Sequence, residues 1–89
     1  MTTYRGAPSA AWTAVELEPF TAVYHRPSGT THLLVEPAPQ LLKLLAGEAL
    51  SFEMLVRRLA DAFDLPDLNE RAFQARLAEL IEAGLVATA

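Results

Sequence analysis

Cysteine is absent from the 89 residues, which excludes a disulfide framework, a thiolate nucleophile and a thiolate metal site. The four glycines are spread one at a time, so no glycine-rich loop is available to cradle a phosphate. No apolar run approaches the roughly 18 residues that span a bilayer. Residues 1–11 also lack the apolar stretch of a secretory signal. We therefore expect a cytoplasmic protein without a membrane partner.

Basic residues are few as well. Seven Lys and Arg stand against eleven Asp and Glu, and the formal charge of −4 opposes contact with phosphates, so we expect no nucleic-acid partner. Hydrophobic residues make up 52% of the chain, which is typical of a globular domain and not of a disordered one. At this length the chain forms one domain that buries about 60–65% of its unfolded surface.

The most informative stretch is residues 20–35, in which two short apolar runs are joined by a Pro-Ser-Gly turn. Proline presets the backbone of a turn and glycine adopts the left-handed conformation that closes it, so the stretch predicts a β-hairpin. If Arg26 pairs with Thr30, the residue numbers of every other pair across the hairpin add up to the same value. This rule assigns each residue to one of the two faces of the sheet. We expect one face to carry Phe20, Ala22, Tyr24, His32 and Leu34, and the other to carry Thr21, Val23, His25, Thr31, Leu33 and Val35.

The rest of the chain predicts one further strand and three helices. Residues 11–17 alternate weakly and complete a three-stranded meander, whereas residues 1–10 show no periodicity and are expected to form a flexible N-terminal tail. Beyond Val35 the apolar periodicity is helical. The helices are expected to end at Gly47, near Asp64 and at Gly84, with Ser51 capping the second, Asp67 or Asn69 capping the third, and Phe73, Leu77, Leu80 and Ile81 forming the buried stripe of the third.

This order predicts an α+β fold in residues 11–89, a winged-helix-like arrangement in which a three-stranded antiparallel sheet is followed by three helices. The last strand, residues 31–35, is expected to keep an unpaired edge, and such an edge is a site for strand addition by a peptide. Two alternatives stay open. In the first, the chain is a winged-helix regulator whose last two helices bind DNA. In the second, the edge pairs with a second copy of the chain, and the protein is a homodimeric structural subunit.

Residues able to carry catalysis are few. His25 and His32 are expected on opposite faces of the sheet, so they do not converge on a metal ion or form an acid–base pair. The serines at positions 9, 28 and 51 fall in the predicted tail, turn and helix cap, with no histidine placed to activate them. We therefore expect a protein that is not an enzyme and has no catalytic residue, metal or cofactor.

The run YHRPSGTTHLL followed by a leucine-rich helix, then SFEMLVRRLADAFDLP and a final helix ending in EAGLV, resembles the PqqD-like peptide chaperones, also called RiPP recognition elements. The chain is most similar to the branch found in HPr-rel-A systems, over about residues 12–86. The resemblance implies a domain that binds the leader segment of a ribosomally made precursor peptide and presents it to a separate modifying enzyme. That enzyme is expected to be HPr-kinase-like or another maturation protein.

The resemblance also implies where the peptide binds. The leader adds as a further strand along the third strand and lies in a groove against the third helix. Either flank of that helix could form the groove wall, one with Ala72, Arg76 and Ala83 and the other with Gln74 and Ala78, and Arg76 is expected to pair with an acidic leader residue. The implied peptide-binding residues are Thr31, His32, Leu33, Leu34, Val35, Ala72, Gln74, Arg76 and Ala83.

Overall fold

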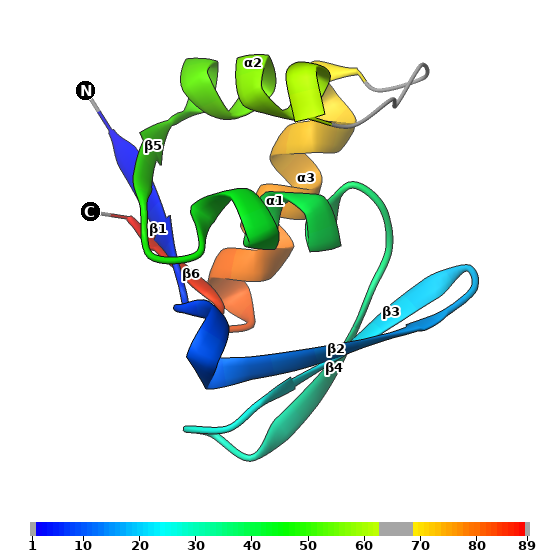
Figure 1. The fold of residues 1–89 in the computed structure, drawn as a ribbon. Helices are drawn as coiled ribbons and strands as arrows, with labels where there is room; N and C mark the ends of the chain where they lie inside the picture. Colours follow the sequence, from blue (N-terminus) through cyan, green and yellow to red (C-terminus); the bar gives the residue numbers. More distant parts are fainter. Residues whose placement is uncertain (1, 63–68, 89) are drawn as a thin grey trace.

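The computed structural model describes residues 2–62 and 69–88. Its elements in chain order are β1 (Thr3–Gly6), the 3-10 turn η1 (Ser9–Ala11), β2 (Trp12–Leu17), β3 (Phe20–His25), β4 (Thr30–Leu34), α1 (Ala38–Leu45), β5 (Ala49–Ser51), α2 (Phe52–Ala62), α3 (Glu70–Glu82) and β6 (Val86–Thr88). The strands form two antiparallel sheets, with the orders β5-β1-β6 and β2-β3-β4. Figure 1 shows the three helices on one side of the β2-β3-β4 sheet and the β5-β1-β6 sheet beside both ends of the chain.

The fold class expected from the sequence is confirmed. The fold is α+β, because the β2-β3-β4 meander is antiparallel and the three helices follow it. The predicted caps at Ser51 and Asn69 are also present. The Ser51 hydroxyl accepts a hydrogen bond from the amide three residues later (3.3 Å), and the Asn69 carboxamide oxygen does the same (2.8 Å). The alternative cap Asp67, and the expected end of the second helix near Asp64, lie outside the described residues.

The expectation of a loose N-terminal tail is wrong for residues 3–6. This segment is β1, the central strand of the β5-β1-β6 sheet, in which Tyr4 pairs with Leu50 on one side and Thr88 on the other. The Tyr4 side chain packs against the core. The sequence gives no signal for this strand because both partners are three-residue strands far along the chain, too short to show alternation.

The predicted register of the hairpin is wrong by one residue. β3 and β4 pair with His25 opposite Thr30, whereas the sequence predicted Arg26 in that place. The Arg26 amide donates to the Ala11 carbonyl oxygen (2.8 Å) and its guanidinium donates to the Ala10 carbonyl oxygen (2.6 Å), so Arg26 is held beside the start of β2. The loop therefore has four residues, and a one-residue change of register moves every β4 side chain to the opposite face.

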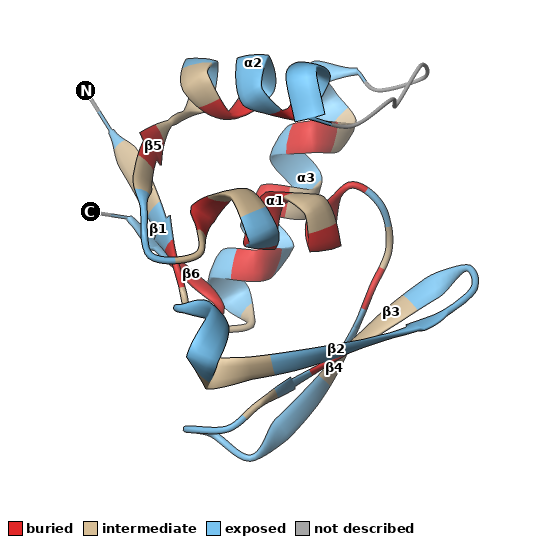
Figure 2. Ribbon diagram, in the orientation of Figure 1, coloured by how far each residue is buried: buried red, intermediate tan, exposed pale blue. Residues whose placement is uncertain are grey.

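The observed register gives the β2-β3-β4 sheet an inner face toward the helices and an outer face away from them. Val23 and Leu34 are buried on the inner face, and Figure 2 shows that most of the remaining sheet is exposed. The inner face consists of Trp12, Ala14, Glu16, Thr21, Val23, His25, Thr30, His32 and Leu34, and the outer face of Thr13, Val15, Leu17, Phe20, Ala22, Tyr24, Thr31 and Leu33.

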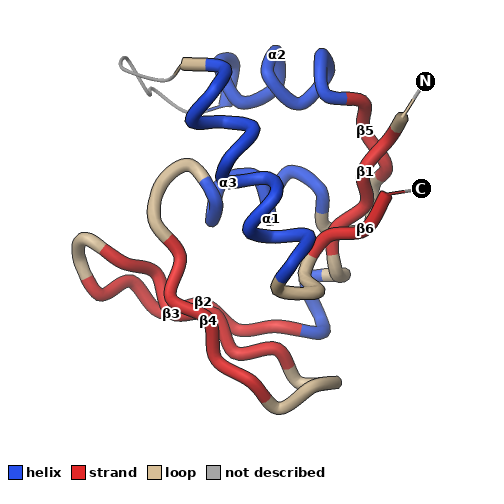
Figure 3. The backbone as a smooth tube through the Cα atoms, turned by 180° about the vertical axis from the view of Figure 1, so that it is seen from behind, coloured by secondary structure: helices blue, strands red, loops and turns tan. Residues whose placement is uncertain are grey.

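The core lies between the helices and the two sheets. Figure 3 shows from behind how α3 crosses α1 within this layer. The α3 stripe buries Phe73, Leu77 and Leu80 as expected, whereas Ile81 is 37% exposed and was wrongly expected in the stripe. The Phe52 ring packs edge-to-face against the Phe73 ring, with ring centroids 5.0 Å apart, and this contact stabilises the packing of α2 on α3. None of the helices within the described ranges has the length and apolar character needed to cross a membrane.

Candidate functional site

β4 is the candidate binding edge because it lies at one end of the β2-β3-β4 sheet. Within residues 2–62 and 69–88 it pairs only with β3, so one side of its backbone has no strand partner. Such a backbone offers N–H and C=O groups to another extended segment. The unpaired edge expected from the sequence is therefore present in the described part of the chain.

The register identifies which β4 groups point to the open side. The Arg26 amide donates to the Ala11 carbonyl, and these two residues continue the β2–β3 register as direct partners. Alternate β3 residues, Tyr24 among them, therefore bond toward β2, and the residues between them bond toward β4. Thr31 lies opposite Tyr24, and Leu33 lies opposite Ala22, which also bonds toward β2. It follows that the N–H and C=O groups of Thr31 and Leu33 point outward.

The β4 side chains divide between the two faces. Thr31 and Leu33 are exposed on the outer face, Leu33 by 62%. His32 is half-buried on the inner face, and Leu34 belongs to the core with only 5% exposure. Val35, just beyond the strand, is half-buried. A peptide beside β4 therefore meets the main chain of Thr31 and Leu33, while Leu34 holds the strand to the core.

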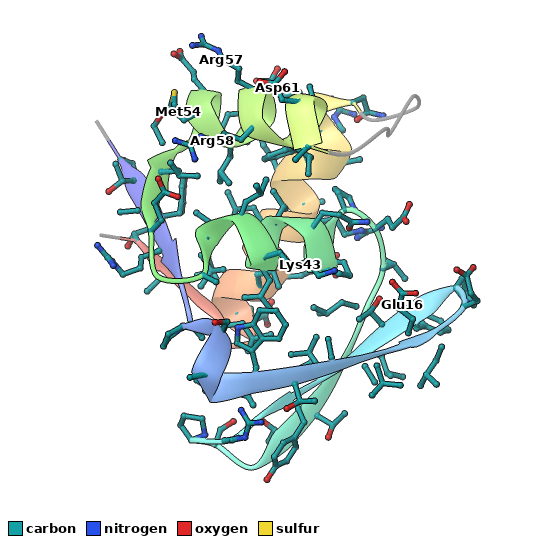
Figure 4. The ribbon with its side chains drawn as sticks, viewed as in Figure 1. Glu16, Lys43, Met54, Arg57, Arg58 and Asp61 are labelled. Atoms are coloured by element: carbon teal, nitrogen blue, oxygen red, sulfur yellow. The ribbon has the colours of Figure 1, made fainter. Side chains whose placement is uncertain are left out.

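A cleft of about 1010 Å³ opens between the inner face of this sheet and α1. Its walls come from the β2–β3 hairpin, the segment that leaves β4, α1, and one residue of α3. Figure 4 shows Glu16 on the hairpin and Lys43 on α1, which both line this cleft. The residues that bring charged or amide groups to it are Glu16, Glu18, Glu36, Gln40, Lys43 and Arg76.

The structure separates the two flanks of α3. Arg76 lines the cleft together with Val35, so these two residues implied by the resemblance come together. Gln74 lines a different hollow, of about 360 Å³, on the side of α3 that faces β1 and the start of α2. Ala72 and Ala83 are half-buried and line neither space. The Arg76 flank is therefore the one that adjoins the β2-β3-β4 sheet.

Hydrogen bonding in the cleft is incomplete. The Arg76 guanidinium pairs with Glu79 on its own helix, and the Gln40 amide donates to the Glu36 carboxylate (3.3 Å). Within the described residues, however, two buried atoms have no hydrogen-bond partner, Gln40 Oε1 and Arg76 Nε. Buried polar atoms are normally bonded. Both atoms are covered by neighbouring protein atoms, so a ligand in the cleft reaches them only if these side chains rearrange.

The two histidines lie on the same face of the sheet, so the expectation that they lie on opposite faces is wrong. His25 Nδ1 lies 2.8 Å from Ser28 Oγ, Ser28 Oγ lies 2.6 Å from Thr30 Oγ1, and Thr30 Oγ1 lies 3.2 Å from His32 Nε2. The one-residue change of register brings them together, and this chain of side chains joins β3, the turn and β4. No three His, Asp or Glu side chains of the described residues are grouped to hold a metal ion.

The basic residues of α2 lie among carboxylates. Arg58 pairs with Glu48 at 3.5 Å, and Figure 4 shows Arg57, Arg58 and Asp61 projecting from the same helix. A phosphate backbone that approached this surface would meet negative as well as positive side chains. This arrangement gives the DNA-binding alternative no local support.

Sequence reasoning missed Gln40 and Lys43 as cleft residues. They are the polar side chains of α1, whose other residues are Ala, Pro and Leu. Polar positions on a helix that is otherwise apolar mark the side that meets solvent or a ligand, and this signal was available in the sequence. The exposed outer face was missed because the predicted register placed Leu34, a core residue, beside Phe20 and Tyr24.

Comparison with family models, with curated proteins and with solved structures finds no match for this chain. Its function is therefore inferred from the open edge of β4 and from the cleft that begins at Val35.

Proposed function

We propose that this protein is a non-catalytic peptide chaperone of the cytoplasm. It binds the leader segment of a ribosomally made precursor peptide and presents that segment to a separate modifying enzyme. The observation that carries the proposal is the open edge of β4, where the main-chain groups of Thr31 and Leu33 point outward. The resemblance of residues 12–86 to the PqqD-like chaperones supports the choice of a leader segment as the peptide.

Strand addition supplies affinity that depends little on the leader sequence. Thr31 and Leu33 together offer two N–H donors and two C=O acceptors, and each hydrogen bond contributes about 0.5–1.5 kcal/mol net. Four such bonds give about 2–6 kcal/mol, from which the cost of ordering the peptide is subtracted. The main chain alone therefore binds weakly, and side-chain contacts have to supply the remaining affinity.

The cleft is the proposed source of selectivity. Val35 leads from β4 into it, and Arg76 belongs to its wall. Because the Arg76 guanidinium already pairs with Glu79, an acidic leader residue has to displace a carboxylate to bind there. A neutral segment meets no such competition, because it leaves the Arg76–Glu79 pair intact. The leader segment at this point is therefore proposed to be uncharged.

Calorimetric titration with matched proline variants tests the proposal. The probes are synthetic peptides that cover the N-terminal segments of small proteins encoded beside this gene. Leu33→Pro removes an outward donor from β4, and Thr88→Pro removes an outward donor from β6, an edge strand of the other sheet outside the cleft. Proline is tolerated on edge strands where the lost N–H faces solvent, so both variants should fold. Leu33→Ala keeps the donor and removes only the side chain.

We expect Leu33→Pro to lower peptide affinity at least about tenfold, since it removes a hydrogen bond and places a ring in the path of the incoming strand. Thr88→Pro should leave the affinity unchanged, and Leu33→Ala should cause a smaller loss than Leu33→Pro. Far-UV circular dichroism checks that all three variants are folded. Binding that survives Leu33→Pro, or that is lost only with Thr88→Pro, contradicts strand addition at β4. Failure of every peptide to bind the wild-type chain contradicts leader binding itself.

A further inference from the structure

The outer face of the β2-β3-β4 sheet is apolar and has no partner among the described residues. The strand residues of this face are uncharged, and the Arg26 guanidinium reaches its turn end, where it donates to Thr13 Oγ1 (2.6 Å). Exposed apolar surface of this extent marks interaction sites in soluble proteins. Its large exposed side chains are Val15 (54%), Leu17 (53%), Phe20 (42%), Tyr24 (44%) and Leu33 (62%).

The residue at the centre of the outer face is the small Ala22. Ala22 lies opposite Val15 on one neighbouring strand and opposite Leu33 on the other. Phe20 and Tyr24 stand two residues before and after it on the same strand and the same face. The small Ala22 side chain is therefore surrounded by four larger ones. A protruding ring from another molecule can be received over it.

We propose that this face is a homodimer interface in which two β2-β3-β4 sheets pack face to face. A partner for it has to be largely apolar and of the same width, and the face itself meets both conditions. In a two-fold arrangement, the Tyr24 ring of each copy packs over the small Ala22 of the other, so the same contact forms twice. Aligned sheets pack in this way at a separation of about 10 Å.

The size of the face sets the strength of the dimer. Three strands of up to six residues cover roughly 15 Å by 20 Å. Because protruding side chains enlarge this flat area, the accessible surface of the face is about 500 Å² per copy. A dimer would then bury about 1,000 Å² in total, which is below the roughly 1,200–2,000 Å² of stable specific interfaces and typical of weak, transient ones. We therefore expect a reversible dimer with a dissociation constant on the order of 10–100 micromolar.

The charge of the chain gives the dimer a distinctive salt dependence. Each copy carries a formal charge of −4, so two copies repel at a distance, although the strand residues that meet in the interface are uncharged. Added salt screens this repulsion and should tighten the dimer. The outward main-chain groups of Thr31 and Leu33 lie in the plane of the sheet, so packing on its face leaves them free. The dimer does not rest on peptide binding and can be tested without a peptide.

Sedimentation equilibrium of the full chain, from low micromolar to millimolar concentration and in dilute and concentrated sodium chloride, measures the dimer. Val15→Glu places a carboxylate in the interface twice and should weaken dimerisation at least about a hundredfold. Val15→Thr keeps the β-branched shape and should cause a smaller loss. The matched control is Val56→Glu, which changes an exposed valine of α2 (37%) outside the face and should leave the dimer unchanged.

A dimer that is weakened by both Val15 variants, unaffected by Val56→Glu and tightened by salt supports the proposal. A chain that stays monomeric over the whole concentration range overturns it, and so does a dimer that survives Val15→Glu. Circular dichroism shows whether each variant is folded. If Val15→Glu is unfolded, Val15→Thr and the salt series decide, and a dimer that neither of them changes overturns the proposal.

Discussion

Replacing Gly6 with alanine tests the placement of β1 against α1. An added Cβ atom would lie 3.0 Å from Leu45 Cβ and 3.1 Å from the Leu45 carbonyl oxygen. Carbon atoms pack best at about 3.5–4.0 Å. Leu45 is fully buried at the end of α1, so neither its side chain nor its backbone can move away at low cost. Overpacking of this kind costs about 1–3 kcal/mol.

The expected net effect is smaller than the overpacking cost. Alanine reduces the conformational entropy of the unfolded chain, which favours the variant by about 0.4–1 kcal/mol. We therefore expect the free energy of unfolding to fall by about 1–2 kcal/mol, and the melting temperature by about 4–16 °C. Thermal and urea denaturation followed by circular dichroism measure both quantities. The control is Arg5→Ala in the same strand, which is exposed and loses one hydrogen bond, from its guanidinium to the Gly47 carbonyl.

The two interpretations of the N-terminus predict different effects of Gly6→Ala on stability. If residues 1–10 formed a loose tail, Gly6→Ala would leave the stability of the folded domain unchanged. An unchanged or higher melting temperature for Gly6→Ala would refute the placement of β1 as the central strand of its sheet. A clear fall for Gly6→Ala, with at most a small fall for Arg5→Ala, agrees with it.

Two further substitutions test the helix cap and the turn. Asn69→Ala removes the side-chain acceptor at the start of α3 and should lower the free energy of unfolding by about 1 kcal/mol in urea denaturation, whereas an unchanged value would argue against the cap. Arg26→Lys cannot keep both guanidinium hydrogen bonds, to the Ala10 carbonyl and to Thr13 Oγ1 (2.6 Å each). Amide hydrogen exchange in the β3–β4 hairpin should become faster, and exchange at the wild-type rate would show that the turn does not depend on Arg26.

Local signals in the sequence predicted most of the fold. The α3 stripe and the caps at Ser51 and Asn69 depend on residues within one or two turns of each other, and the structure contains all of them except Ile81 in the stripe. The meander was predictable for the same reason, because its strands follow one another with short turns between them.

The errors have long-range or tertiary causes. β1 depends on partners near residues 50 and 87, which no local pattern can indicate. The register depends on whether Arg26 belongs to the turn or to the strand, and its hydrogen bonds to Ala10 and Ala11 decide this. The candidate site was predictable in part. The open edge followed from strand order, but the choice of the Arg76 flank required the arrangement of α1 and α3 around the cleft.

Amide hydrogen exchange along β4, resolved by nuclear magnetic resonance, tests the open edge most directly. In the free chain the amides of Thr31 and Leu33 should exchange fast, and the amide of His32, which bonds toward β3, should exchange slowly. When a leader peptide binds, the amides of Thr31 and Leu33 should become slow as well. Slow exchange at both residues in the free chain, or no change on peptide binding, would contradict strand addition at this edge.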